Sequence, residues 1–306
     1  MNIAKRQKYI DSLYASLHTL SGKCKDMDIT VADGEVIVKE ANPSKRKGQD
    51  FYEYYLQLNP NKAVSDRTLI KKYSDFDKVL REAFERLEVV EFRLNRADLS
   101  FNTDNESDYE LFKKLNRLLI CCISENEGID NCYETNDLWK LRSLSVAIKS
   151  NRLEVENYNK ELESKGKTEA KTRLELRSKC LSIPLEELPK EFTEKWFARL
   201  DGAYDKFKEV QDRYNQTLID IWKADQLNDS KNREFINFTA FLQTYKDCIF
   251  TKAQLIDLFE RTGVSKNPTN SANHYKDNHK IEFYSKTDLR EIIKAIKKCT
   301  LKYFSN

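Results

Sequence analysis

Glycine and histidine are scarce in this sequence of 306 residues. Only seven glycines occur, and none builds a G-x-x-x-x-G-K-[ST] or G-x-G-x-x-G run, so Gly-rich phosphate-binding loops are excluded. The three histidines, His18, His274 and His279, form no paired cluster of the kind that two-histidine metal nucleases need. A catalytic metal would therefore depend on oxygen ligands, which suits Mg²⁺ or Mn²⁺.

Signals for disulfides, zinc and membranes are also missing. The seven cysteines are odd in number and show no C-x-x-C spacing, which argues against a disulfide framework and a structural zinc site. No apolar run approaches the roughly 20 residues that cross a bilayer. Lys and Asp interrupt residues 1–20, where a signal peptide would stay apolar. We expect a cytoplasmic protein with no membrane partner.

Charge is abundant but nearly balanced, except near the end of the sequence. Asp, Glu, Lys and Arg make up 34% of the residues and the net charge is +3, so any affinity for nucleic acid must come from local clustering. From residue 261 onward, ten basic residues stand against four acidic ones. The helix, turn and candidate recognition helix in this region predict a helix-turn-helix or winged-helix unit within residues 234–306.

Polar and basic side chains in this unit can reach base edges and phosphates. An ordinary surface helix with a cationic face is the alternative. The predicted DNA-binding residues are Arg261, Lys266, Asn270, Asn273, His274, Lys276, Lys280 and Lys286.

The first 183 residues mix strand and helix patterns. Ile10, Leu13, Leu17 and Leu20 have helical spacing and predict an amphipathic helix over residues 4–20. The further predicted elements are a hairpin over 28–40, a helix over 74–87, a strand over 89–103, a helix over 107–124, a strand over 138–150 and a hairpin over 152–178.

This order predicts an α+β fold with an N-terminal antiparallel sheet, helices on one face and the other face left open. Two prolines within residues 183–192 mark a boundary. We therefore predict a catalytic domain over 1–183 and an all-α, DNA-binding domain over 184–306.

Three of the predicted strands carry much charge on one side. Side chains alternate between the faces of a strand, and here apolar residues take one parity while polar residues take the other. If the strands are neighbours, one face gathers both charge signs and a tyrosine. That face is either a solvated surface with cross-strand ion pairs or a phosphate-handling site. Its members are Arg96, Asp98, Ser100, Asn102, Glu154, Glu156, Tyr158, Lys160, Arg173, Glu175 and Arg177.

Phosphoryl-transfer chemistry gives these residues candidate roles. Converging carboxylates can bind a divalent cation, and the predicted metal ligands are Asp98, Glu154, Glu156 and Glu175. A tyrosine can form a phosphotyrosine that conserves the energy of the broken phosphodiester, and arginines suit phosphate oxygens. The predicted catalytic group is Tyr158, Arg173, Arg177 and Lys160.

The motifs "RADLSFN", "YNKELE" and "TRLELR" resemble those of trans-acting replication initiators of rolling-circle plasmids and phages. In that family an R-x-D strand precedes a Y-[DN]-K-x-x-E strand and an R-x-E-x-R strand; the resemblance covers roughly residues 85–180. It implies a Rep- or relaxase-like fold, Asp98 and Glu175 as metal ligands, and Tyr158 as the single nucleophile. Attack by the tyrosine would leave a 5′-phosphotyrosine and a free 3′-OH for a host polymerase.

Two functional hypotheses follow from these observations. The first is an initiator of plasmid or mobile-element replication that binds origin duplex and single-stranded DNA and nicks and rejoins one strand with Mg²⁺ or Mn²⁺. A conjugative relaxase would use the same chemistry. The second is a non-catalytic origin- or operator-binding protein, such as a partition or transcription regulator, whose charged sheet residues pair among themselves. A homodimer and a host helicase or polymerase are further partner hypotheses.

Overall fold

A computed structural model of the protein describes residues 13–26, 36–40, 54–59, 70–104, 112, 115–116, 132–134, 144–147, 153–166, 171–229, 231–279 and 283–305. The strands are β1 Tyr14–Asp26, β2 Val36–Glu40, β3 Tyr54–Leu58, β4 Val90–Thr103, β5 Cys132–Glu134, β6 Leu144–Ala147, β7 Leu153–Asn159 and β8 Thr172–Ser178. The helices are α3 Tyr73–Arg86, α5 Lys160–Ser164, η4 Leu185–Glu187, α6 Leu188–Lys190, η5 Glu191–Lys195, α7 Trp196–Asp205, α8 Phe207–Leu227, α9 Phe238–Thr244, η6 Lys246–Cys248, α10 Lys252–Thr262, α11 Pro268–His279 and α12 Lys286–Phe304.

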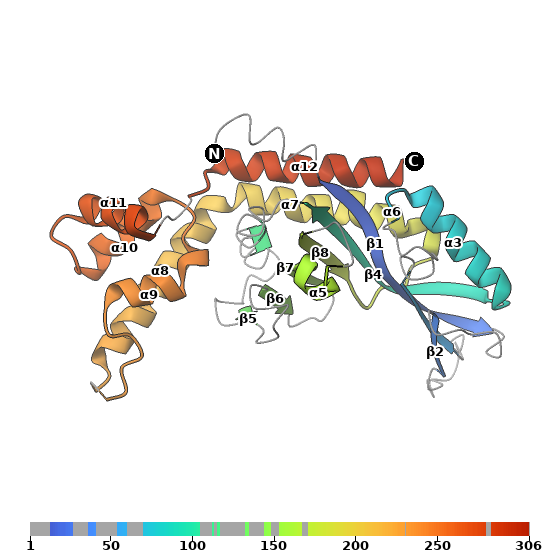
Figure 1. Ribbon diagram of the computed structural model, residues 1–306, viewed down its shortest axis with the longest axis horizontal. Helices are drawn as coiled ribbons and strands as arrows, with labels where there is room; N and C mark the ends of the chain where they lie inside the picture. Colours follow the sequence, from blue (N-terminus) through green and yellow to red (C-terminus); the bar gives the residue numbers. More distant parts are fainter. Residues whose placement is uncertain are drawn as a thin grey trace. The chain divides into compact units, whose positions relative to one another are not determined.

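The strands form one sheet, followed along the chain by a helical region (Figure 1). Its strand order is β2-β3-β1-β4-β8-β7-β6-β5. The pairs β2/β3, β3/β1, β1/β4, β4/β8, β8/β7 and β7/β6 are all antiparallel. The α+β fold class is therefore confirmed. The three motif-bearing strands β4, β8 and β7 are neighbours in the middle of the order.

The helix predicted over residues 4–20 is wrong for its described part, because Tyr14–Asp26 is strand β1. Leu17 lies opposite Leu99 and Leu20 lies opposite Ala97, with a register shift between Leu17 and Thr19. A β-bulge of this kind adds one residue to a strand and changes its parity. Leu17 and Leu20 thus share a face although they are three residues apart, and this spacing imitates a helical period.

The other predicted elements agree with the structure where it describes them. The helix over 74–87 is α3, the strand over 89–103 is β4, and the hairpin over 152–178 is β7 and β8. In the predicted hairpin 28–40, Val36–Glu40 is strand β2, and it pairs with β3. Residues 28–35 lie outside the described residues, as does most of the predicted helix 107–124.

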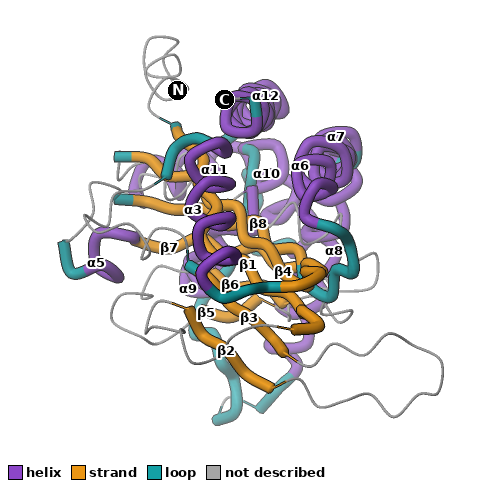
Figure 2. Tube along the Cα trace, turned by 90° about the vertical axis from the view of Figure 1, so that its right-hand side faces the viewer, coloured by secondary structure: helices purple, strands orange, loops and turns teal. Residues whose placement is uncertain are grey.

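Helices pack on the apolar face of the sheet. The indole Nε1 of Trp196 donates to the Ser178 hydroxyl at 2.8 Å, and the backbone N–H of Leu17 donates to the Tyr303 hydroxyl at 3.3 Å. The ring of Phe92 in β4 lies 4.9 Å from that of Phe84 in α3, centroid to centroid. Figures 1 and 2 show α6 and the end of α12 on the same side of the strands. The prediction of helices on one face is confirmed for these elements.

Contacts divide the chain into two compact units. The sheet unit comprises residues 1–109, 133–198 and 294–306, and the helical unit comprises 110–132 and 199–293. Residues 184–198 and 294–306 thus group with the sheet, because Trp196 and Tyr303 contact its strands. The division of the chain at residue 183 into a catalytic and a DNA-binding domain stays a prediction.

The helical unit has its own aromatic core. Phe207 and Tyr214 of α8 contact Phe250, and Trp222 contacts Phe241. Thr251 caps α10 by accepting the N–H of Gln254, and α10 ends at Gly263 with φ of 68°, a left-handed conformation that favours glycine. Among the helices that the structure describes, none has both the length and the apolar character for a bilayer crossing.

Candidate functional site

The polar side chains of the central strands β4, β8 and β7 lie on one continuous face of the sheet, as predicted. Asp98 lies opposite Arg177 in the β4/β8 pair, and Tyr158 lies opposite Arg173 in the β7/β8 pair. Glu156 lies opposite Glu175, so two carboxylates face each other across β7 and β8. We call this set the polar face; its charged and aromatic members are Arg96, Asp98, Glu154, Glu156, Tyr158, Arg173, Glu175 and Arg177.

Tyr158 is at the centre of a buried hydrogen-bond group. Its hydroxyl donates to Oε1 of Glu175 at 2.6 Å, and Nη1 of Arg173 donates to the same hydroxyl at 3.3 Å. Burial, together with the negative charge of Glu175, raises the pKa of Tyr158 well above its usual value, although the positive charge of Arg173 opposes this. At neutral pH the phenol is therefore protonated, with a carboxylate in place to accept its proton.

Arg173 is oriented by Asn102, a member of the predicted face for which no role was predicted. Its Nε donates to Oδ1 of Asn102 at 2.7 Å, and the Asn102 amide donates to the hydroxyl of Ser100 at 3.3 Å. The Arg173 side chain is fully buried, and among the described residues its Nη2 has no hydrogen-bond partner. An unpaired buried guanidinium N–H is costly, so this atom is a candidate donor to an anion. Strand parity had placed Asn102 on the same face as Asp98, but its contact with Arg173 depends on how β4 and β8 pair.

Arg177 binds carboxylates from both neighbouring strands. Its Nη2 donates to Oε2 of Glu175 at 2.5 Å and to Glu156, its Nη1 donates to Glu154, and its Nε lies 3.7 Å from Oδ2 of Asp98. All four predicted metal ligands therefore meet one guanidinium. The cross-strand ion pairs that the sequence left as an alternative are present.

Two further cations complete the charge balance. Arg96 binds Asp98 through two bonds, Nε to Oδ1 at 2.8 Å and Nη2 to Oδ2 at 2.5 Å. Burial nevertheless raises the pKa of Asp98, against the lowering effect of Arg96. Lys179 binds Glu154. The sequence did not assign Lys179, which directly follows β8.

Lys160 begins α5 and lies beside the tyrosine ring. Its ammonium is 5.8 Å from the centroid of the Tyr158 ring and is paired with Glu163. Burial, and then the positive charge of Arg173, lower the pKa of Lys160.

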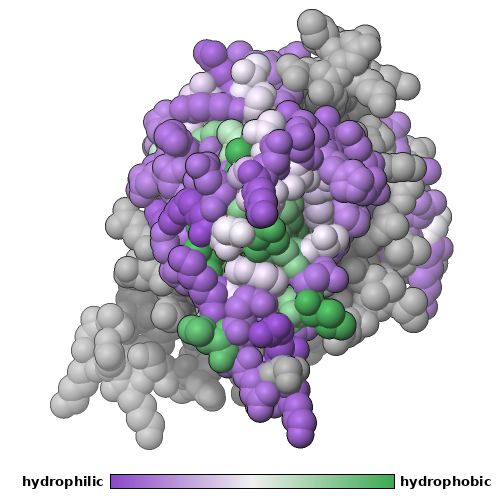
Figure 3. All heavy atoms as spheres, turned by 90° about the vertical axis from the view of Figure 1, so that its left-hand side faces the viewer, coloured by the Kyte–Doolittle hydropathy of each residue, from purple (hydrophilic) through white to green (hydrophobic). Residues whose placement is uncertain are grey.

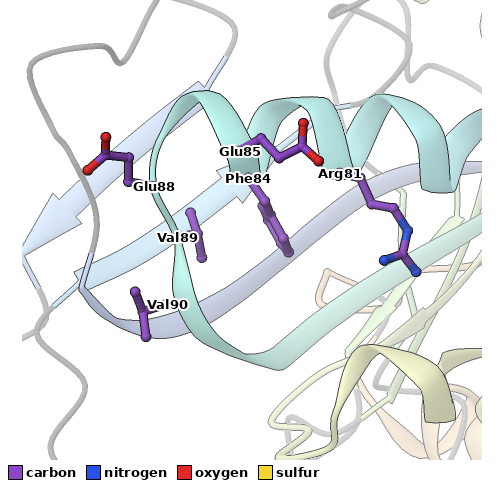
Figure 4. A pocket seen from close by; sticks show the side chains of 6 residues that line it. All are labelled: Arg81, Phe84, Glu85, Glu88, Val89 and Val90. Carbon is purple, nitrogen blue, oxygen red and sulfur yellow. The ribbon is translucent and has the colours of Figure 1, made fainter.

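The expectation of an open face is wrong for the centre of the polar face. Tyr158 is 4% exposed, Asp98 is 1% exposed, and Arg173 and Glu175 are both fully buried. The charged groups bind one another instead of water, and such pairing lets charges tolerate burial. A surface hollow of about 480 Å³ lies between α3 and the start of β4 and is lined by Arg81, Phe84, Glu85, Glu88, Val89 and Val90 (Figure 4).

The carboxylates as arranged do not fit a divalent metal ion. Among the described residues, no group of three or more His, Cys, Asp or Glu side chains could hold one. One carboxylate oxygen of each of the four predicted ligands contacts the guanidinium of Arg177. Both oxygens of Asp98 also accept hydrogen bonds from Arg96. Binding of Mg²⁺ or Mn²⁺ by these residues stays a prediction.

The predicted DNA-binding residues lie on α10, α11 and α12, apart from Lys266 in the turn and Lys280, which is outside the described residues. Asn270, His274 and Lys276 are exposed on α11, while Ala272 and Tyr275 face inward and the Tyr275 hydroxyl accepts a hydrogen bond from Gln243 at 3.0 Å. The surface drawn in Figure 3 is mainly hydrophilic, with a smaller area of white and green residues at its centre.

Two of the predicted DNA-binding cations have partners within the helical unit. Arg261 binds Gln216 of α8, and the ammonium of Lys286 lies 4.5 Å from the centroid of the Tyr204 ring. Helices α10 and α11 follow each other with a short connection, and a helix-turn-helix that binds DNA stays a prediction.

Comparisons with known proteins add little to this description. No protein-family description matches the chain, and no curated protein sequence matches it. Among solved structures, the chain is similar to a rolling circle replication initiator protein from Geobacillus stearothermophilus, with 11% sequence identity and a TM-score of 0.30. The similarity covers 55% of this chain and 74% of that one. A similarity at this level carries no argument about function, which therefore depends on the residues described above.

Proposed function

We propose that this protein initiates replication of a plasmid or other mobile element by binding its origin DNA and by nicking and rejoining one strand through Tyr158. The supporting observation is the buried group in which the Tyr158 hydroxyl bonds both Glu175 and Arg173. A nucleophile, a base and a cation for phosphate are thereby held within hydrogen-bond reach of one another.

The proposed reaction needs one proton transfer and one displacement. Glu175 takes the phenolic proton while the Tyr158 oxygen attacks the phosphorus, and the bond from phosphorus to the 3′ oxygen breaks. The 3′ oxygen leaves and takes up a proton, and the 5′-phosphate remains on the tyrosine. Rejoining reverses these steps, so no external energy source is required.

Arginine and lysine side chains have distinct proposed roles in this reaction. Arg173 binds a phosphate oxygen through Nη2, the buried donor for which the described part of the chain offers no partner. Arg177 acts as a positioning residue, because its bonds to Oε2 of Glu175 leave Oε1 directed at Tyr158. Lys160 adds positive charge beside the ring. A DNA strand reaches Tyr158 only when the polar face opens, since the ring is 4% exposed.

The helical unit is proposed to recognise the origin duplex. Asn270, His274 and Lys276 are exposed on α11, and side chains of these types bind base edges and phosphates. Lys276→Ala should weaken binding about equally for all sequences and reduce the salt dependence by about one counterion. Asn270→Ala should instead reduce the preference for the origin over unrelated duplex.

A strand-nicking assay tests the catalytic proposal. Supercoiled plasmid carrying the candidate origin is incubated with protein, in parallel with Mn²⁺ and with a chelator, and denaturing gels detect DNA attached covalently to protein. Tyr158→Phe keeps the ring and should abolish the adduct while duplex binding persists. Tyr204→Phe, in the helical unit, is the matched control and should keep it. An adduct that survives Tyr158→Phe contradicts the assignment of the nucleophile.

A non-catalytic DNA-binding protein is the second candidate. The observation in its favour is the mutual pairing of the charged side chains on the polar face, with a tyrosine whose pKa burial has raised. This candidate predicts specific duplex binding through α11 and no covalent product under any condition of the nicking assay.

A further inference from the structure

The polar face has a positive centre that belongs to the chain itself. Arg177 projects from β8 between Glu154 and Glu156 of β7 and Asp98 of β4, and it also binds Glu175 on its own strand. Its side chain is 15% exposed, whereas three of the four carboxylates are 1–3% exposed. A cation is thus enclosed by oxygen ligands from three adjacent strands.

Three of the four remaining carboxylate oxygens of this cluster are also engaged. Arg96 binds both oxygens of Asp98, Lys179 binds the second oxygen of Glu154, and the Tyr158 hydroxyl binds the second oxygen of Glu175. Four carboxylates, Asp98, Glu154, Glu156 and Glu175, are matched by the four cations Arg96, Arg173, Arg177 and Lys179. A divalent ion added to this set would leave it with excess positive charge in a buried place, which is unfavourable.

We propose that the guanidinium of Arg177 is the resident cation of this carboxylate cluster and holds the position that a divalent metal ion takes in an oxygen-ligand site. A planar guanidinium can donate to several carboxylates in different directions, which an ammonium group does less well. The same strands without Arg177 would present converging carboxylates with no central cation, and that arrangement binds Mg²⁺ or Mn²⁺. The inference does not depend on the nicking reaction, because it concerns the unliganded protein.

Mn²⁺ titration of the folded protein, followed by calorimetry and by electron paramagnetic resonance of free Mn²⁺, tests the proposal. The wild-type protein and the Glu156→Gln variant should bind the same amount of Mn²⁺, because the carboxylate cluster holds none. Arg177→Met replaces the guanidinium with an uncharged chain and should create one Mn²⁺ site. That new site should be lost again in the double variant Arg177→Met with Glu156→Gln. Arg81→Met, which removes an exposed guanidinium from α3, is the matched control and should create no site.

Each outcome of the titration decides the question. A wild-type site that Glu156→Gln abolishes would overturn the proposal, as would a folded Arg177→Met protein that binds no Mn²⁺. If Arg177→Met does not fold, the proposal is tested by comparing Mn²⁺ binding and the melting temperature of the wild-type protein with those of Glu156→Gln. No Mn²⁺ binding by either, with a lower melting temperature for Glu156→Gln, supports Arg177 as the cation, because the variant removes one of its partners. An unchanged melting temperature refutes it.

Discussion

Replacing Glu175 with glutamine is expected to destabilise the sheet unit strongly. Glu175 is buried and accepts bonds from Tyr158 at 2.6 Å, from Arg177 at 2.5 and 3.0 Å, and from Arg173 at 3.4 Å. Glutamine has nearly the same volume, so no cavity forms. The change removes one negative charge and places an –NH₂ group against hydrogen-bond donors. The guanidiniums of Arg173 and Arg177 then lose a buried counter-charge.

The magnitude follows from burial. Removing one partner of a buried ion pair costs about 3–5 kcal/mol, whereas removing one partner of an exposed pair costs little. Arg177 still pairs with Glu154 and Glu156 after the substitution. We therefore expect the free energy of unfolding to fall by about 3 kcal/mol, the lower end of this range. Asp77→Asn is the control, since Asp77 pairs with the exposed Arg81 on α3, and it should leave stability unchanged.

Urea denaturation followed by tryptophan fluorescence measures the difference. Trp196 is buried and donates to Ser178 at the end of β8, so its emission reports on the strand that carries Glu175. The reasoning is refuted if Glu175→Gln lowers the free energy of unfolding by less than about 1 kcal/mol, which is the range of exposed pairs. That result would mean that water reaches the polar face.

Three further predictions concern other parts of the chain. Cys180, which is exposed, should react with iodoacetamide in the native protein at pH 8, whereas Cys299, whose pKa burial raises to about 12, should react only on unfolding; peptide mapping separates them. Gly22→Ala should lower the free energy of unfolding in urea by more than about 1 kcal/mol, because its Cβ would collide with the Phe92 ring and the Arg93 carbonyl oxygen of β4. Gly202→Ala in α7 meets no side chain or neighbouring element and should stabilise the protein by about 0.5–1 kcal/mol. Thr251→Ala removes the cap of α10 and should lower the melting temperature, at a cost of about 1 kcal/mol.

Alternation within single strands was readable from the sequence. Parity separated Asp98, Glu175 and Tyr158 from the apolar side chains of their own strands, and the pairing of β4, β8 and β7 brings the three onto one face. The prediction succeeded because a regular strand repeats every two residues, whatever its neighbours are. The same regularity fails at a bulge, which explains why Leu17 and Leu20 in β1 suggested a helix.

Burial of the polar face was not readable from the sequence. A charged side chain in a strand usually faces water, so the pattern around Arg173 and Glu175 favoured an open surface. Charges become buried only when partners from several strands meet in three dimensions, as Asn102 of β4 meets Arg173 of β8. Strand order and register, rather than composition, decide whether such partners exist.

The bond between the N–H of Leu17 and the hydroxyl of Tyr303 joins positions 286 residues apart. On a translating ribosome, β1 emerges before α12, so the sheet unit cannot finish folding until the whole segment from β1 to α12 has been made. The helical unit draws most of its residues from one continuous stretch, 199–293, and can complete its contacts sooner. Contacts between residues far apart in the sequence form slowly. We therefore expect the helical unit to become structured during synthesis, before α12 packs on β1.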